Sequence, residues 1–211
     1  MERTPRLLAA APPSDPSGLV VLLHGGANRR GNPMVSPAQL SVLRMLPIAK
    51  RIARAGRGRL GVFRLLNSHR GWDSTHTPVD DVSWALGELN KRYAGGVPTC
   101  LVGHSLGGRA ALLAGSSPGV VSVVALNPWV YSTDHADLTG RRVLMIHGTD
   151  DRVASIDRAA TVAKRLATTG DVTFQTVEGG RHAMLRSRDE FERPAAAFVV
   201  DTLLRRDSPP R

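Results

Sequence analysis

The chain has 211 residues, of which 42% are hydrophobic, and its 21 glycines and 14 prolines allow for many turns. This length fits one domain with a core that needs no disulfide or metal to fold. The formal net charge of +10 would by itself suit a polyanion. However, the basic residues are nearly all Arg and are scattered along the sequence, and even the densest stretch, 50–64, interleaves them with Gly, Ala and Leu. We therefore expect a solvated basic surface and no nucleic-acid partner.

The single cysteine, Cys100, excludes an internal disulfide, and its place in an apolar run predicts a buried side chain. The apolar run at 7–11 is too short, and too soon broken by two prolines, for a secretory signal. No later run approaches the length of a membrane span. The sequence thus predicts a cytoplasmic protein with no membrane partner.

Short, continuous, β-branched apolar runs are typical of parallel strands covered by helices on both faces. In chain order they are 19–23, 60–65, 99–102, 120–126 and 143–146, with a sixth strand expected at 171–177. Helical spacing falls between them, at 37–55, 79–93, 106–114, 156–168 and 188–204. Ser36 and Pro37 should open the first helix, and Pro47 should kink it or split it in two.

Because strands and helices alternate, the expected fold class is α/β, with a doubly wound, mostly parallel sheet of about six strands and helices on both faces. We divide the chain into an N-terminal extension at 1–18, one domain at 19–204 and a C-terminal tail at 205–211. Ligands in such sheets bind beyond the carboxyl ends of the strands.

A glycine-rich segment, Gly-His-Ser-Leu-Gly-Gly at 103–108, lies directly between a predicted strand and a predicted helix. This is the pattern of a nucleophile elbow, a sharp turn that holds a serine hydroxyl above the sheet while glycines give room to the neighbouring backbone. Ser105 is therefore the candidate nucleophile.

A serine needs a base to take its proton, and in this type of fold the chain order is serine, acid, histidine. His182 is the only histidine after the acid candidates, and it lies in the loop between the last strand and the last helix. Asp150 and Asp151 both follow the strand 143–146, and the residue pattern alone leaves the choice between them open. Backbone N–H groups of Leu106 and of Gly26, with Ala27 as second choice, are the candidate oxyanion donors.

Together these motifs resemble the α/β-hydrolase superfamily, over about 19–204. His24-Gly25-Gly26 is similar to its oxyanion loop, residues 147–153 (His-Gly-Thr-Asp-Asp-Arg-Val) to its acid loop, and Gly180-Arg181-His182 to its terminal motif. The resemblance assigns the acid to Asp151. The general look is that of small esterase-like and dienelactone-hydrolase-like members without a cap. Those similar to dienelactone hydrolase often have Cys as nucleophile, so Ser105 argues against that particular activity.

About sixteen residues separate the strands 120–126 and 143–146, too few for a lid domain, so an open site is expected. Its walls should include 28–34, 67–77 and 127–131. Besides Ala27, Trp129 and Met184 are the candidate substrate contacts.

These features predict a serine hydrolase that cleaves a carboxylic ester or thioester through an acyl-Ser105 intermediate. An acyltransferase with the same triad, or a binding protein of the same fold without turnover, remains an alternative. Zinc-site and phosphate-loop motifs are absent from the sequence, so we expect no metal and no cofactor. The expected partner is a small-molecule ester or thioester, and the expected state is a monomer or homodimer.

Overall fold

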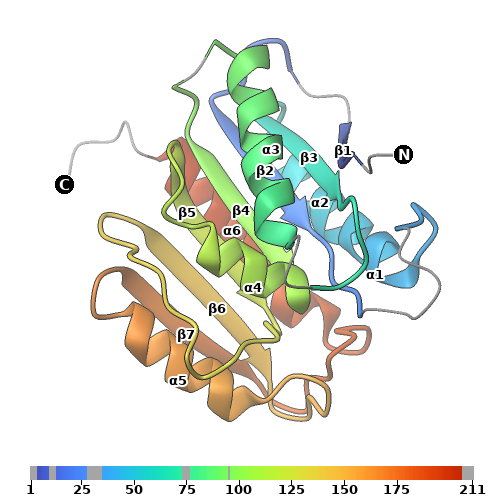
Figure 1. Cartoon of the computed structure of the whole chain (residues 1–211), viewed down its shortest axis with the longest axis vertical. Coiled ribbons are helices and arrows are strands. Elements are labelled where there is room, and N and C mark those ends of the chain that lie inside the picture. The colour runs from blue at the N-terminus through green and yellow to red at the C-terminus, as the bar shows by residue number, and fades with distance from the viewer. Residues whose placement is uncertain (1–3, 10–12, 28–34, 73–76, 95, 206–211) are drawn as a thin grey trace.

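The computed structural model describes residues 4–9, 13–27, 35–72, 77–94 and 96–205. Its centre is a seven-stranded sheet with the order β1-β3-β2-β4-β5-β6-β7 (Figure 1). β1 pairs antiparallel with β3, and every other neighbouring pair is parallel. The carboxyl ends of the six parallel strands therefore meet at one edge, where a site is expected.

The strands are β1 (Arg6–Ala9), β2 (Gly18–Leu23), β3 (Leu60–Leu66), β4 (Thr99–His104), β5 (Val120–Leu126), β6 (Arg142–Gly148) and β7 (Asp171–Val177). The helices are α1 (Leu40–Leu43), α2 (Met45–Gly56), α3 (Pro78–Arg92), α4 (Leu106–Leu113), α5 (Ile156–Leu166) and α6 (Arg188–Leu204). Strand and helix alternate along most of the chain, as the sequence predicts.

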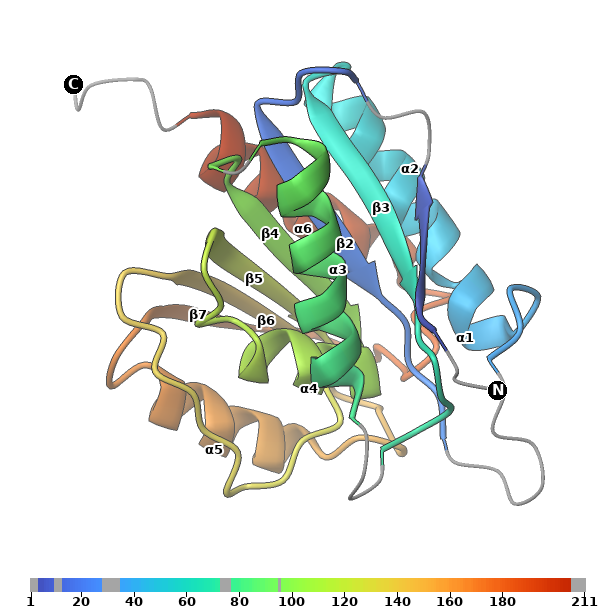
Figure 2. The same cartoon turned by 45° about the horizontal axis from the view of Figure 1, so that its top comes forward.

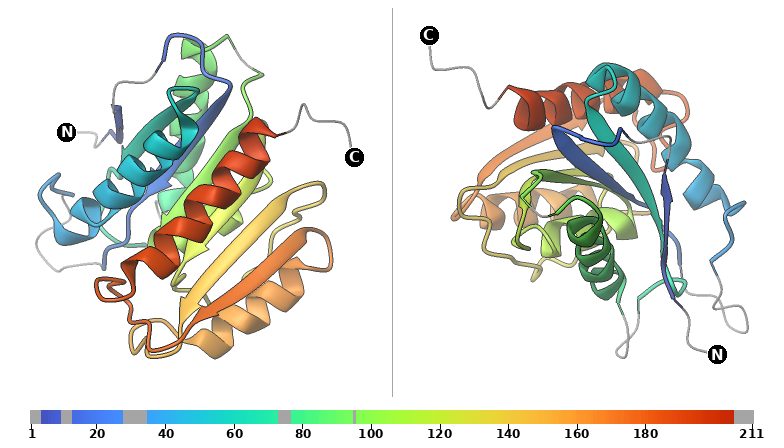
Figure 3. Two further views of the ribbon diagram at one scale, coloured as in Figure 1. Left: turned by 180° about the vertical axis from the view of Figure 1, so that it is seen from behind. Right: turned by 90° about the horizontal axis from the view of Figure 1, so that it is seen from above.

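Two helical layers cover the sheet. Figure 2 shows α3, α4 and α5 on one face, and Figure 3 shows α2 and α6 on the other. Side chains alternate between the layers: on β4, Leu101 packs with the α3–α5 layer, whereas Val102 packs with the α2–α6 layer. Both faces are buried, which explains why the strands read as continuous apolar runs. Cys100 is fully buried, as expected.

The fold differs from the sequence prediction in two places. The first is β1, a strand within the segment expected to be an extension, which makes the sheet seven-stranded. The second is the start of the helix expected at 37–55, which begins at Leu40; the helix is split in two at Arg44, as the sequence predicted. Pro47 lies in the first turn of α2, where its missing N–H would have no helical partner, and therefore does not break that helix.

Within the described residues, no helix is both long enough and apolar enough to cross a membrane. The loop predicted at 28–34, part of the loop at 67–77 and most of the C-terminal tail lie outside the described residues.

Candidate active site

Ser105 occupies the sharp turn between β4 and α4, with φ 56° and ψ −120°. A positive φ is strained for a residue with a side chain, and such strain is typical of functional turns. Two glycines make the turn possible. A Cβ on Gly103 would lie 2.1 Å from the carbonyl oxygen of Gly107, and a Cβ on Gly107 would lie 2.3 Å from that of Leu23. The elbow predicted from the sequence is present.

His182 comes from the loop after β7 and lies between Ser105 and Asp151. Its Nε2 is 3.0 Å from the Ser105 Oγ, and its Nδ1 is 2.7 Å from the Asp151 Oδ2. If Nδ1 carries the proton and donates to the carboxylate, Nε2 is free to accept the serine proton. The structure thus brings all three predicted residues into one hydrogen-bonded chain.

The Asp151 carboxylate is fully buried, and its second oxygen accepts the backbone N–H groups of Val153 and Ala154 at 2.8 and 2.9 Å. Burial alone would raise the pKa of Asp151, but the hydrogen bonds from His182 and from these two N–H groups lower it overall. The carboxylate is therefore ionised beside the imidazole. Asp150 is exposed, so the geometry separates two aspartates that the residue pattern did not.

Asn127, at the end of β5, joins the loops that carry His182 and Asp151. Its side-chain N–H₂ donates to the carbonyl oxygens of Arg181 and His182 at 3.2 and 3.3 Å, and its Oδ1 accepts the Gly148 N–H at 2.8 Å. Its side chain is fully buried, and its backbone has φ 42°. Sequence analysis missed this role, although Asn127 stands where the carboxyl end of a strand leads to the site.

His104 directly precedes the nucleophile and forms a hydrogen bond to the loop that carries His182. Its Nε2 is 2.8 Å from the His182 carbonyl oxygen, to which it donates, and the two rings are 4.9 Å apart. Burial, together with the neighbouring His182, lowers the pKa of His104 to about 3. His104 is therefore a neutral positioning residue at ordinary pH.

The backbone segments expected to hold an oxyanion meet at Ser105. A Cβ on Gly25 would lie 3.0 Å from the Cβ of Ser105, and Gly26 has φ 150°, which side chains rarely adopt. Leu106 is the first residue of α4, where backbone N–H groups lack helical partners and the helix dipole favours negative charge. Leu106 therefore adjoins the nucleophile, and Gly26 lines the same cavity as Ser105.

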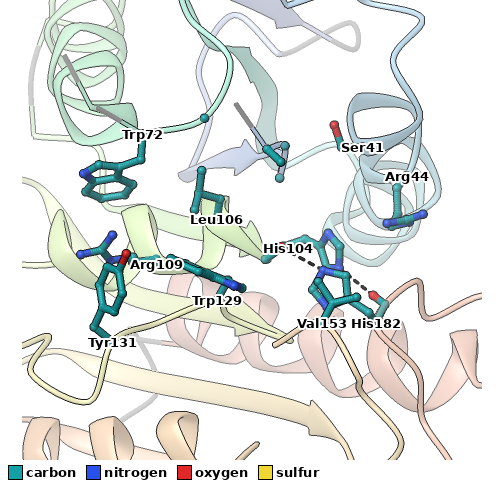
Figure 4. Close-up of a pocket in the computed structure, with 15 residues that line it drawn as sticks. Ser41, Arg44, Trp72, His104, Leu106, Arg109, Trp129, Tyr131, Val153 and His182 are labelled. Carbon is teal, nitrogen blue, oxygen red and sulfur yellow. Dashed lines mark hydrogen bonds between the residues drawn. The ribbon is translucent and has the colours of Figure 1, made fainter. Parts of the chain in front are cut away.

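A cavity of about 560 Å³ opens above Ser105. Figure 4 draws the residues that line it, which include Ala27 and Trp129, as predicted. Met184 does not line it, and that prediction is wrong. Met184 has φ 58° and is only 5% exposed, because its side chain packs into the core beside α6 rather than toward the cavity.

One wall of the cavity is built around Arg109, four residues after the nucleophile on α4. Its guanidinium forms two hydrogen bonds to Asp134, at 2.8 and 2.9 Å, and lies over the rings of Trp72 and Tyr131 at 4.1 and 4.6 Å (Figure 4). The rings of Trp129 and Tyr131 pack in a T-shaped arrangement, with ring centroids 5.1 Å apart. Together these contacts hold the aromatic side chains in fixed positions. Sequence analysis did not predict this structural role of Arg109.

No protein-family model matches this chain, and a search of curated proteins found no match. Solved structures do match. A putative α/β hydrolase of unknown function from Agrobacterium tumefaciens has a TM-score of 0.70 at 18% identity, over 98% of this chain and 94% of that one. Est1E from Butyrivibrio proteoclasticus, solved with ferulic acid bound, has a TM-score of 0.65 at 13% identity, over 94% and 95%. A monoacylglycerol lipase from Paleococcus ferrophilus has a TM-score of 0.66 at 16% identity, over 93% and 99%.

At these identities the similarity establishes the fold, which is the α/β-hydrolase fold expected from the sequence motifs. The chain between β5 and β6, residues 127–141, contains no helix, and no cap domain is inserted there.

Proposed function

We propose that this protein is a serine hydrolase that cleaves carboxylic esters or thioesters through an acyl-Ser105 intermediate. The observation that carries the proposal is the continuous hydrogen-bonded chain from Asp151 through His182 to the Ser105 hydroxyl. It lies at the carboxyl ends of the strands, under an open cavity.

In the first half-reaction His182 takes the Ser105 proton as Oγ attacks the carbonyl carbon, and the buried Asp151 carboxylate stabilises the imidazolium that forms. The oxyanion accepts hydrogen bonds from the backbone N–H groups of Leu106 and Gly26. Each such donor contributes about 3 to 4 kcal/mol to transition-state stabilisation. His182 then gives the proton to the leaving alcohol or thiol. In the second half-reaction His182 activates water, which releases the acid and restores Ser105.

Two further observations support an ester as the substrate. Several solved structures of the same fold are described as esterases or as a monoacylglycerol lipase, and the described residues between β5 and β6 insert no cap domain beside the cavity above Ser105. A preorganised site open to water favours hydrolysis of the acyl-enzyme, although transfer to another acceptor would use the same residues.

A fluorophosphonate probe tests the proposal directly, because it reacts with activated serines. Mass spectrometry of the labelled protein should place the adduct on Ser105, and labelling should be lost in Ser105→Ala and fall sharply in His182→Ala. The wild type should also hydrolyse short p-nitrophenyl esters. Absence of both labelling and hydrolysis in folded protein, checked by circular dichroism, would refute the proposal and favour a binding role.

A further inference from the structure

The cavity above Ser105 has two ends of different chemistry. Figure 4 shows Trp72, Arg109 and Tyr131 at one end and Ser41 and Arg44 at the other. The first end is aromatic. The second comes from α1 and the residue after it, and both of its side chains are polar.

The two arginines differ in their partners. Arg109 is neutralised by the two hydrogen bonds from its guanidinium to Asp134. Arg44 has no carboxylate within ion-pair distance in the described part of the chain, and its Nε is buried without a hydrogen-bond partner. Burial lowers the pKa of Arg44 from its usual value, but an arginine side chain stays charged in proteins. No Asp or Glu is among the described residues that line the cavity.

Ser41 adds a second donor beside this charge. Residues three apart on helical backbone lie on the same face, and both Ser41 and Arg44 border the cavity. The Ser41 Oγ accepts a hydrogen bond from the Gln39 amide at 2.6 Å. Because that bond occupies an oxygen lone pair, the Ser41 O–H remains available to donate to another group.

A partly buried guanidinium without a counter-charge is costly, and an anionic ligand would remove that cost. We propose that Arg44 and Ser41 form a subsite for a carboxylate group, so that the preferred substrates are esters that carry a free carboxylate. A guanidinium matches the two oxygens of a carboxylate, and the Ser41 hydroxyl supplies a further donor. The net charge of +10 would also attract an anionic substrate. This inference rests on the proposed function.

Two pairs of substrates, matched in shape and differing in charge, test it. In the first pair, 4-acetoxybenzoate and 4-acetoxybenzamide, the group that varies is on the leaving phenol. In the second, the phenyl monoester of adipic acid and phenyl adipamate, it is on the acyl chain. For at least one pair we expect kcat/KM to be about tenfold higher for the carboxylate, the size typical of a charged hydrogen bond.

The ratio of kcat/KM for the carboxylate to kcat/KM for the amide should fall toward one in Arg44→Gln. It should be partly retained in Arg44→Lys, which keeps the charge but not the planar guanidinium. Arg54→Gln is the matched control, because Arg54 is exposed on α2, outside the cavity lining, and its loss changes the net charge equally. The ratio within each pair should not change in that variant.

Binding without turnover separates this proposal from the proposed function. In Ser105→Ala, calorimetric titration should give a lower Kd for the carboxylate compound of the preferred pair than for its amide. Adding Arg44→Gln to this variant should abolish the difference in Kd. Arg44-dependent binding without any hydrolysis by the wild type would keep the subsite and refute the esterase. Hydrolysis with no carboxylate preference, or with a preference that Arg44→Gln leaves intact, would refute the subsite and keep the esterase.

Discussion

Asp150 and Asp151 are adjacent in sequence but have opposite environments. Asp151 is buried and bonded to His182, whereas Asp150 is exposed. Asp151→Asn should preserve the bonds to the Val153 and Ala154 N–H groups but favour the wrong imidazole tautomer. We therefore expect kcat to fall by about 10³- to 10⁴-fold, as expected for the acid of a triad.

The measurement is kcat on a p-nitrophenyl ester, and Asp150→Asn is the control, which should stay within about twofold of the wild type, as surface changes commonly do. Equal losses in the two variants, or full activity in Asp151→Asn, would remove Asp151 from the mechanism.

A site residue could be predicted from the sequence when a local motif marks it, and not when its role depends on contacts with residues distant in the chain. Ser105 and His182 follow from short motifs next to predicted strands, because the turn and the chain order are local properties. Asn127 acts through contacts to residues more than fifty positions away, which a single sequence does not reveal. Met184 has a positive φ and packs into the core beside residues of α6, an arrangement that the residue pattern of its loop does not reveal.

At the scale of helices and strands, prediction worked where a run was long enough to show a pattern, whether the run is buried, as in β5, or largely exposed, as in β7. The strands at 120–126 and 171–177 and the helix at 188–204 have their predicted bounds. β1 was missed because it is a four-residue edge strand with two exposed residues, and its stability comes from pairing with β3 rather than from a pattern of its own.

The close packing at the elbow between β4 and α4 predicts opposite effects of alanine at two helical glycines, Gly107 in α4 and Gly87 in α3. Gly107→Ala would place a Cβ 2.3 Å from the Leu23 carbonyl oxygen, whereas a Cβ on Gly87 in α3 would meet nothing within 4 Å. We expect Gly107→Ala to lose about 3 kcal/mol of unfolding free energy through overpacking. Gly87→Ala should gain about 0.5 to 1 kcal/mol from helix propensity.

Urea denaturation followed by circular dichroism measures both changes, and the loss of folded protein would itself satisfy the expectation for Gly107→Ala. Wild-type stability in Gly107→Ala would show that β2 and α4 are not packed as closely as described.

For the molecule as a whole, buried histidines tie stability to pH. His24, His104 and His147 are all buried, and burial lowers the pKa of each below its usual value, to about 3 for His104. In the unfolded chain a histidine titrates near pH 6.5. Below that pH the unfolded state therefore binds protons that the folded state does not, and the free energy of unfolding must fall as the pH falls.

The prediction is a loss of up to about 1.4 kcal/mol per pH unit for each such histidine between pH 6 and pH 4. Asp151, whose pKa is lowered by its hydrogen bonds, adds to this loss only toward pH 4, where an aspartate of the unfolded chain begins to take up protons that the folded chain does not. Urea denaturation at pH 6, 5 and 4 measures the slope, which should become shallower in His104→Gln whatever the absolute stability of that variant. His135 is exposed, so His135→Gln should retain the wild-type slope. An unchanged slope in His104→Gln would mean that His104 takes up its proton in the folded state, and would therefore contradict its role as a neutral support for the His182 loop.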